Sequence, residues 1–210
     1  SVKKYPLKVE KIGKKFGGIS AVDNVSFSVE KGSVTGLIGP NGAGKSTTFD
    51  LITGVTSPDT GVVKFNGENI TGKRPYQVAN TGLVRTFQIT RELKEMTVME
   101  NVMLAPKNQI GQQLSNVLLS KGRKRVEDQE KEMLEKAWET LDTFHLDKLA
   151  NEYAGNLSGG QRKLLEMARV MMMDPSMILL DEPMAGVNPT LKNQIITLIK
   201  KLSKKGYTFL

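Results

Sequence analysis

The 210-residue chain is 39% hydrophobic and 25% charged, which is typical of a folded globular protein rather than a disordered or fibrous one. It has no cysteine and one histidine, so disulfides and thiolate metal sites are excluded and a histidine-based metal centre is not expected. No apolar run approaches the roughly eighteen residues that cross a membrane, and the charged N-terminal residues have no apolar segment behind them. We therefore expect neither a membrane span nor a signal peptide. A reducing cytosol fits this composition, although a chain without cysteine suits any compartment.

The net charge of +8 is concentrated at the two ends of the chain. Residues 1–20 hold six lysines and one acid, and residues 183–210 hold five lysines and no acid. Such basic ends fit either a nucleic-acid or anionic membrane surface, or a solvated surface that attracts an anionic ligand. The lysines lack the interleaved run of aromatic residues that a nucleic-acid groove needs, so we favour the second interpretation and expect no nucleic-acid partner.

The N-terminal part of the chain is expected to be rich in strands. Residues 7–12 and 25–29 alternate apolar and polar side chains, as half-buried strands do. A turn at Lys31 and Gly32 leads to the apolar run 34–38, which we interpret as another strand.

A phosphate-binding loop follows this run and precedes a helix expected at residues 47–52. Its spacing fits G-x-x-x-x-G-K-[ST], in which glycines let backbone N–H groups surround phosphate oxygens at a helix start. Lys45 would reach the β- and γ-phosphates, and Ser46 would reach a magnesium ion. The alternative is a glycine-rich turn that happens to contain a lysine, but the flanking strand and helix favour the loop. Its residues are Gly39, Pro40, Asn41, Gly42, Ala43, Gly44, Lys45, Ser46 and Thr47.

Beyond this helix the spacing of the apolar residues changes twice. Residues 62–65 followed by the Asn66-Gly67 turn predict a hairpin, and residues 83–87 predict a short strand. From residue 98 to 149 apolar residues recur at helical spacing among many charges, which predicts a helical lobe. The apolar positions are Val126, Met133, Ala137, Leu141 and Phe144.

The C-terminal part returns to alternating helices and strands. We expect helices at 158–173 and 190–205, a buried strand at 177–180 and the opening of another strand at 207–210. Strand and helix thus alternate on both sides of the lobe, which predicts an α/β sheet with a helical insertion.

Two acids follow the buried strand, at the end where open α/β sheets bind ligands. Asp181 would orient the magnesium shell, and Glu182 would be the general base that activates water against the γ-phosphate. The alternative is an acidic pair that caps the next helix. Together with the phosphate loop, the functional interpretation is favoured.

A second helix start also predicts anion binding. Ser158, Gly159, Gly160 and Gln161 directly precede a helix, and their free N–H groups could meet an anion. Ser158 is explained by simple capping, but the glycine pair is not, because glycine in a helix costs about 1 kcal/mol per residue.

With these motifs in place, the whole chain resembles the ATP-binding cassette of ABC transporters. The resemblance implies an α/β fold with a P-loop NTPase core (residues 1–87 and 158–210), an antiparallel β subdomain and an inserted α-helical subdomain (88–157). It assigns residues 39–47 to Walker A, 157–161 to the signature and 177–182 to Walker B. It also makes Gln88 the Q-loop residue, which would act in catalysis and at the magnesium ion.

The same resemblance implies that Phe16 stacks on adenine, with a core phenylalanine as the alternative. It further implies that two cassettes enclose two ATP molecules between Walker A of one and the signature of the other. Residues 89–104 would face the membrane subunit, with Ile89, Leu93 and Met96 forming part of a groove, unless these are ordinary lobe core.

Three stretches, 82–88, 96–102 and 181–189, are similar to the cassettes of branched-chain amino acid importers, although Asn188 stands where many cassettes have Asp. We therefore expect an ATP-hydrolysing subunit that uses ATP and Mg²⁺ at the cytoplasmic face of a membrane. Its expected partners are transmembrane permease subunits and a second cassette. A soluble ATPase acting on ribosomes or DNA and a regulatory nucleotide-binding fragment are the alternatives.

Cassettes of this family continue into a histidine that contacts the γ-phosphate, whereas the present sequence stops at Leu210. The one histidine, His145, is expected to be an ordinary packed or surface side chain of the lobe. We therefore expect a truncated cassette that binds ATP and hydrolyses it weakly.

Overall fold

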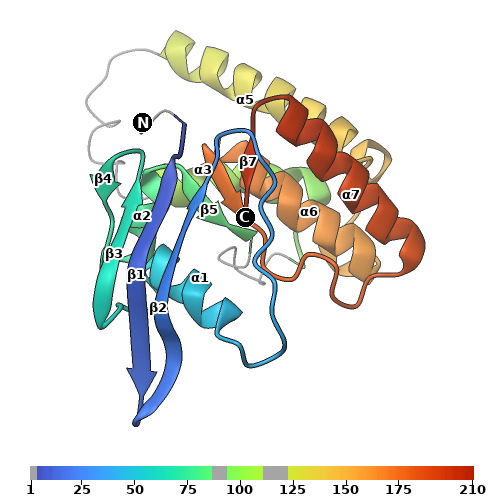
Figure 1. Ribbon diagram of the computed structural model, residues 1–210. Coiled ribbons are helices and arrows are strands. Elements are labelled where there is room, and N and C mark those ends of the chain that lie inside the picture. Colours follow the sequence, from blue (N-terminus) through green and yellow to red (C-terminus); the bar gives the residue numbers. More distant parts are fainter. Residues whose placement is uncertain (1–3, 87–93, 111–122) are drawn as a thin grey trace. The chain divides into compact units, whose positions relative to one another are not determined.

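The computed structural model describes residues 4–86, 94–110 and 123–210 (Figure 1). The chain forms two compact units. Unit 1 comprises residues 1–86, 175–182 and 196–210, and unit 2 comprises residues 87–174 and 183–195. The subdomain boundaries expected at 87/88 and 157/158 stay a prediction.

An antiparallel sheet of unit 1 has the strand order β2-β1-β3-β4, and Figure 1 shows its three long strands side by side. Asn66 and Gly67, which join β3 to β4, have φ values of 49° and 87°. Positive φ at both turn residues gives the tight hairpin that this dipeptide predicts. The strands are β1 (Leu7–Phe16), β2 (Ile19–Val29), β3 (Thr60–Phe65) and β4 (Glu68–Asn69).

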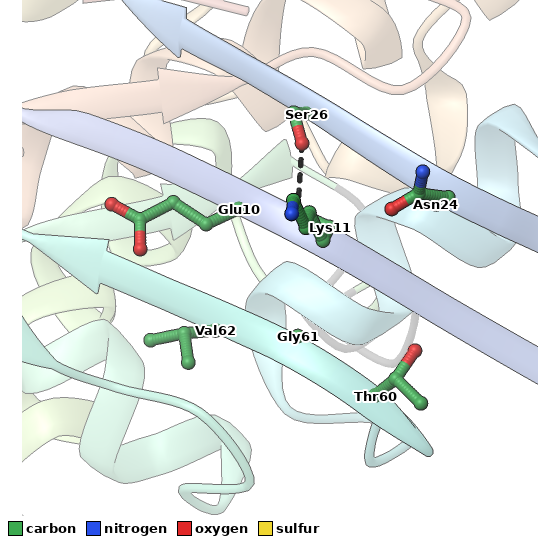
Figure 2. Close-up of a pocket in the computed structure, with 7 residues that line it drawn as sticks. All are labelled: Glu10, Lys11, Asn24, Ser26, Thr60, Gly61 and Val62. Carbon is green, nitrogen blue, oxygen red and sulfur yellow. Dashed lines mark hydrogen bonds between the residues drawn. The ribbon is translucent and has the colours of Figure 1, made fainter.

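Strand β1 is interrupted in its middle, where the pairing with β2 shifts register between Val9 and Ile12. Lys11 has a φ of 50°, and its backbone N donates a hydrogen bond of 2.8 Å to Ser26 Oγ (Figure 2). A Cβ on Gly61 would lie 2.4 Å from Lys11 O, so the neighbouring strand needs glycine here. Residues around this bulge line an open surface pocket of about 670 Å³.

The second sheet of unit 1 is parallel, with the strand order β5-β6-β7. All three residues of β6 are buried, as its continuous apolar run predicts. The strand expected at 34–38 forms only in part. Val34 bridges Phe209, whereas Ile38 is 94% exposed, because the two-residue strand β7 offers few partners. The strands are β5 (Leu83–Arg85), β6 (Met177–Leu179) and β7 (Thr208–Phe209).

Helix α1 (Lys45–Thr53) joins the core of unit 1, together with α2 (Pro75–Asn80). Phe49, Leu51 and Ile52 of α1 belong to one buried cluster with side chains of both sheets. This packing fixes the start of α1 relative to the ends of β5 and β6.

Unit 2 holds the helices that the sequence predicts for residues 98–149. Helices α3, α5 and α6 pack against one another, and Ala137, Leu141 and Phe144 are buried as their spacing predicts. Among the described residues, no helix combines the length and apolar character needed to cross a membrane. The helices are α3 (Val98–Ile110), α5 (Arg123–Thr143) and α6 (Gly159–Met172), with short 3₁₀ turns η2 (Asp147–Leu149) and η3 (Ala154–Asn156). Helix α7 (Pro189–Lys204) contributes residues to both units.

Candidate active site

The predicted phosphate loop, Gly39–Thr47, leads directly into α1. Gly44 is the N-cap residue with a φ of 85°, and no side chain of the described chain caps the helix there. A Cβ at Gly44 would lie 2.3 Å from Ala21 O, so only glycine fits. The helical hydrogen bonds begin where Thr48 N donates to Gly44 O at 2.8 Å. The N–H groups of the three preceding helix residues therefore remain for an anion at the positive end of the helix dipole.

Lys45 folds back over this loop. Its ammonium donates hydrogen bonds to the carbonyl oxygens of Gly39 and Pro40, at 3.0 Å for Pro40. The positive charge thus lies at the loop itself, where phosphate oxygens could replace the carbonyls as acceptors.

The other loop residues are mostly exposed. Ala43 N donates to Pro40 O at 3.1 Å, which closes a turn, and Gly42 within this turn has a φ of 82°. Asn41 and Ser46 are exposed, and Thr47 is half-buried. The Ser46 hydroxyl is therefore accessible at the first turn of α1, as a ligand for a metal ion must be.

Asp181, which follows β6 and Leu180, is held by a buried arginine. Arg85 of β5 donates from Nη2 to Asp181 Oδ2 and from Nη1 to Asp50 Oδ1 of α1, both at 2.6 Å. The side chain of Arg85 is 6% exposed, whereas those of Asp50 and Asp181 are 33% and 20% exposed. One guanidinium therefore connects the phosphate-loop helix to the end of the buried strand.

Arg85 also contacts an aromatic ring, and its surroundings keep it charged. Its guanidinium carbon lies 5.6 Å from the centroid of the Phe49 ring, within range of a cation–π interaction. Burial lowers the pKa of Arg85, but the hydrogen bonds to Asp50 and Asp181 and the negative charges of these two carboxylates together outweigh burial and raise the pKa above its ordinary value. The guanidinium therefore stays charged, and sequence analysis missed it because its partners are 35 and 96 residues away along the chain.

Glu182 lies in a different environment from its neighbour. Its side chain is exposed, and its backbone has a φ of 45°, which is uncommon outside glycine and asparagine. The proposed alternative, that the acidic pair caps the next helix, is not supported. Asn188 does so instead, because its Oδ1 accepts a hydrogen bond of 2.9 Å from Leu191 N in the first turn of α7.

Phe16 ends β1 and is 49% exposed, which excludes the alternative that it is a core residue. The ammonium of Lys14 lies 5.5 Å from its ring centroid and also binds Asp59 Oδ1 at 2.8 Å. That hydrogen bond and one from the backbone of Lys15 lower the pKa of Asp59. The ring therefore offers an exposed face beside a fixed positive charge.

The signature stretch begins α6 with a capping box. Gln161 N donates to Ser158 Oγ at 3.2 Å, and Ser158 N donates to Gln161 Oε1 at 2.9 Å. A Cβ on Gly160 would lie 1.9 Å from Leu191 Cδ2, whereas one on Gly159 would meet nothing within 4 Å. The second glycine of the pair thus has a packing reason that the sequence did not reveal.

Gln88, Ile89 and Leu93 lie outside the described residues, and Met96 is half-buried. His145 is exposed with a φ of 56°, in agreement with a surface position in unit 2.

Comparison with known proteins agrees with this fold and with the family resemblance. Residues 22–185 match the ABC transporter family model. The chain is 45% identical over 204 residues to the probable branched-chain amino acid transport ATP-binding protein LivG of Methanocaldococcus jannaschii, covering 97% of this chain and 78% of that protein. It is 38% identical over 197 residues to the high-affinity branched-chain amino acid transport ATP-binding protein LivG of Escherichia coli K12, covering 93% and 76%.

Solved structures give the same result. The crystal structure of the ADP conformation of an ATP-binding cassette of an ABC transporter superposes with a TM-score of 0.82 at 43% identity, covering 98% of this chain and 80% of that one. A structure of the ATP-binding subunit of another ABC transporter, at 24% identity and a TM-score of 0.74, shares the fold. The chain belongs to the ATP-binding cassettes of the ABC transporter family, which hydrolyse ATP to power transport. The relatives named above are the ATP-binding proteins of branched-chain amino acid transport.

Proposed function

We propose that this chain binds ATP with Mg²⁺ at Gly39–Thr47 and hydrolyses it to drive a membrane permease for branched-chain amino acids. The start of α1 carries the proposal. Gly44 begins this helix without a side-chain cap, and the ammonium of Lys45 lies on the same loop. Backbone N–H groups, a helix dipole and a lysine thus converge where a triphosphate would lie.

The residues present fit a magnesium ion. Mg²⁺ is held by one or two protein oxygens together with substrate phosphates, and its role here would be to neutralise charge that develops on the phosphates. The accessible hydroxyl of Ser46 and the oriented carboxylate of Asp181 offer such oxygens. Gln88 is proposed as a further ligand from the family resemblance.

Three further side chains have roles in binding or hydrolysing ATP. Lys45 binds the β- and γ-phosphates, and the exposed carboxylate of Glu182 accepts a proton from the attacking water. Phe16 supports adenine through its exposed ring.

The Lys45→Ala variant tests the phosphate site. We expect no measurable ATP binding by calorimetric titration, because the lysine supplies the only side-chain cation proposed at the phosphates. Lys73→Ala is the matched control, since Lys73 forms an exposed ion pair with Glu68 in the same unit. If Lys45→Ala binds ATP as tightly as the parent, the site is wrongly placed.

Two chains are proposed to close around two ATP molecules. The support is the second glycine-containing helix start, Ser158–Gln161, where the capping box leaves the N–H groups of Gly159 and Gly160 for an anion. Glu182→Gln should slow hydrolysis and leave an ATP-bound dimer in light scattering. A variant that stays monomeric with ATP, or that hydrolyses ATP at the parental rate, would contradict this assembly.

The proposed place of action is the cytoplasmic face of a membrane, with transmembrane permease subunits as partners. The names of the relatives support the substrate and the partner class. Co-purification from native membranes should recover permease subunits, and ATP turnover of the reconstituted complex should rise with leucine, isoleucine or valine. Recovery of ribosomal proteins or DNA in their place would favour a soluble ATPase.

A further inference from the structure

The ion pair of Arg85 with Asp181 includes a third member, Asp50, to which the functional site assigns no role. The two carboxylates come from the phosphate-loop helix and from the end of β6, and each takes one Nη of the guanidinium at 2.6 Å. Within the described part of the chain, Arg85 Nε has no hydrogen-bond partner. Both carboxylates are therefore bound through the Nη atoms of Arg85.

The charges of this group do not cancel. Two carboxylates share one cation, so the group keeps one net negative charge at the place where a divalent cation is expected. Because a guanidinium is planar and rigid, its two Nη atoms fix where one oxygen of each carboxylate lies relative to the other. Without Asp50, the whole positive charge of Arg85 would be opposed by Asp181 alone.

We propose that Asp50 and Arg85 are positioning residues for Asp181, and that Asp50 keeps Asp181 available to the divalent cation by sharing Arg85. This inference rests on the proposed function, in which Asp181 faces Mg²⁺. Arg85 sets the orientation of the Asp181 carboxylate. Asp50 binds the same guanidinium, so the Arg85 charge neutralises Asp181 less completely. Partners that orient a metal-binding side chain typically change metal affinity 10- to 100-fold when they are removed.

A purely structural role for Asp50 makes a different prediction. If the ion pair only attached α1 to the sheet, its loss would lower stability without changing the affinity for the metal. Metal binding measured apart from hydrolysis distinguishes the two roles.

The experiment titrates Mn²⁺, a spectroscopic substitute for Mg²⁺, into the ATP-bound chain and follows free Mn²⁺ by electron paramagnetic resonance. Asp50→Asn should raise the Mn²⁺ dissociation constant about tenfold, and ATP affinity in EDTA should stay at the parental value. Glu68→Gln is the matched control, because it also removes one negative charge from an ion pair in the same unit, with Lys73. Glu68→Gln should change neither the Mn²⁺ dissociation constant nor the ATP affinity.

Arg85→Lys provides a second variant, since lysine keeps the charge but lacks the two-pronged geometry. It too should weaken Mn²⁺ binding, and near-UV circular dichroism should show a folded chain. Parental Mn²⁺ affinity in both Asp50→Asn and Arg85→Lys would overturn the inference.

Asp181→Asn separates this inference from the proposed function. If Asp181→Asn weakens Mn²⁺ binding but neither Asp50→Asn nor Arg85→Lys does, only the positioning role fails. If Asp181→Asn itself binds Mn²⁺ like the parent, the assignment of Asp181 to the metal site fails as well.

Discussion

Helices α1 and α6 both begin beside glycine, but their first turns are completed differently. At α1 the N-cap residue is Gly44 in the left-handed conformation, with no side-chain cap within the described chain. At α6 the N-cap residue is Ser158, which forms a reciprocal capping box with Gln161. The start of α1 leaves its backbone donors open, whereas the start of α6 satisfies two of its backbone donors, Ser158 N and Gln161 N, from its own side chains.

Because of this difference, the N-termini of α1 and α6 can bind phosphate in different ways. Helix α1 offers consecutive N–H groups and the ammonium of Lys45, so it can surround a phosphate by itself. Helix α6 is already stabilised by its box and offers mainly the N–H groups of Gly159 and Gly160. It is suited to contact a phosphate that is bound elsewhere, in agreement with the proposed arrangement of two chains.

The largest effect should come from Gly44→Ala. Alanine would adopt an unfavourable positive φ and its Cβ would overlap Ala21 O, so we expect a loss of about 3 kcal/mol in the free energy of unfolding, together with loss of ATP binding. Gly42→Ala is the control, because Gly42 also has a positive φ but a Cβ there meets nothing within 4 Å. Gly42→Ala should lower the free energy of unfolding, measured by urea denaturation, by about 1 kcal/mol. Equal losses in the two variants would show that the contact with Ala21 is unimportant.

Ser158→Ala should have an intermediate effect. It removes the oxygen that accepts from Gln161 N, and loss of an N-cap side chain typically costs about 1 kcal/mol. The same urea denaturation measures it, and ATP binding to the single chain should be unchanged because α6 does not hold that nucleotide. A change in ATP affinity of the monomeric chain would contradict the division of roles between the two helices.

The smallest effect should come from Gly160→Ala, compared with Gly159→Ala. A Cβ at Gly160 overlaps the end of the flexible Leu191 side chain, which can rotate away, so the difference between the two variants should be about 0.5 kcal/mol. Adding Leu191→Ala should abolish that difference. If the stability difference persists when Leu191→Ala is added, Gly160 is needed for a reason other than its contact with Leu191.

Local patterns in the sequence were enough to predict much of this molecule. The hairpin turn at Asn66 and Gly67, the start of α6 at Ser158 and the buried strand β6 all follow from neighbouring residues. The membership in the cassette family was likewise correct. The run 34–38 was expected to be a strand throughout, but apolar character alone does not supply a partner strand.

What the sequence did not reveal depends on distant contacts. Arg85 binds Asp50 and Asp181 across 35 and 96 residues, and Gly160 meets Leu191 of a different helix. An arginine within the short strand 83–87 was a possible signal, because a buried charge requires a partner. The roles assigned to Gln88 and to the site residues as a group remain predictions.

The backbone of Glu182 has a consequence for protein engineering. A non-glycine residue at a φ of 45° lowers stability by about 1 kcal/mol relative to glycine. A screen for heat resistance alone would therefore enrich Glu182→Gly or Glu182→Asn, and each would remove the carboxylate proposed to activate water. Thermostable variants of this cassette should accordingly be selected for turnover as well as for resistance to heat.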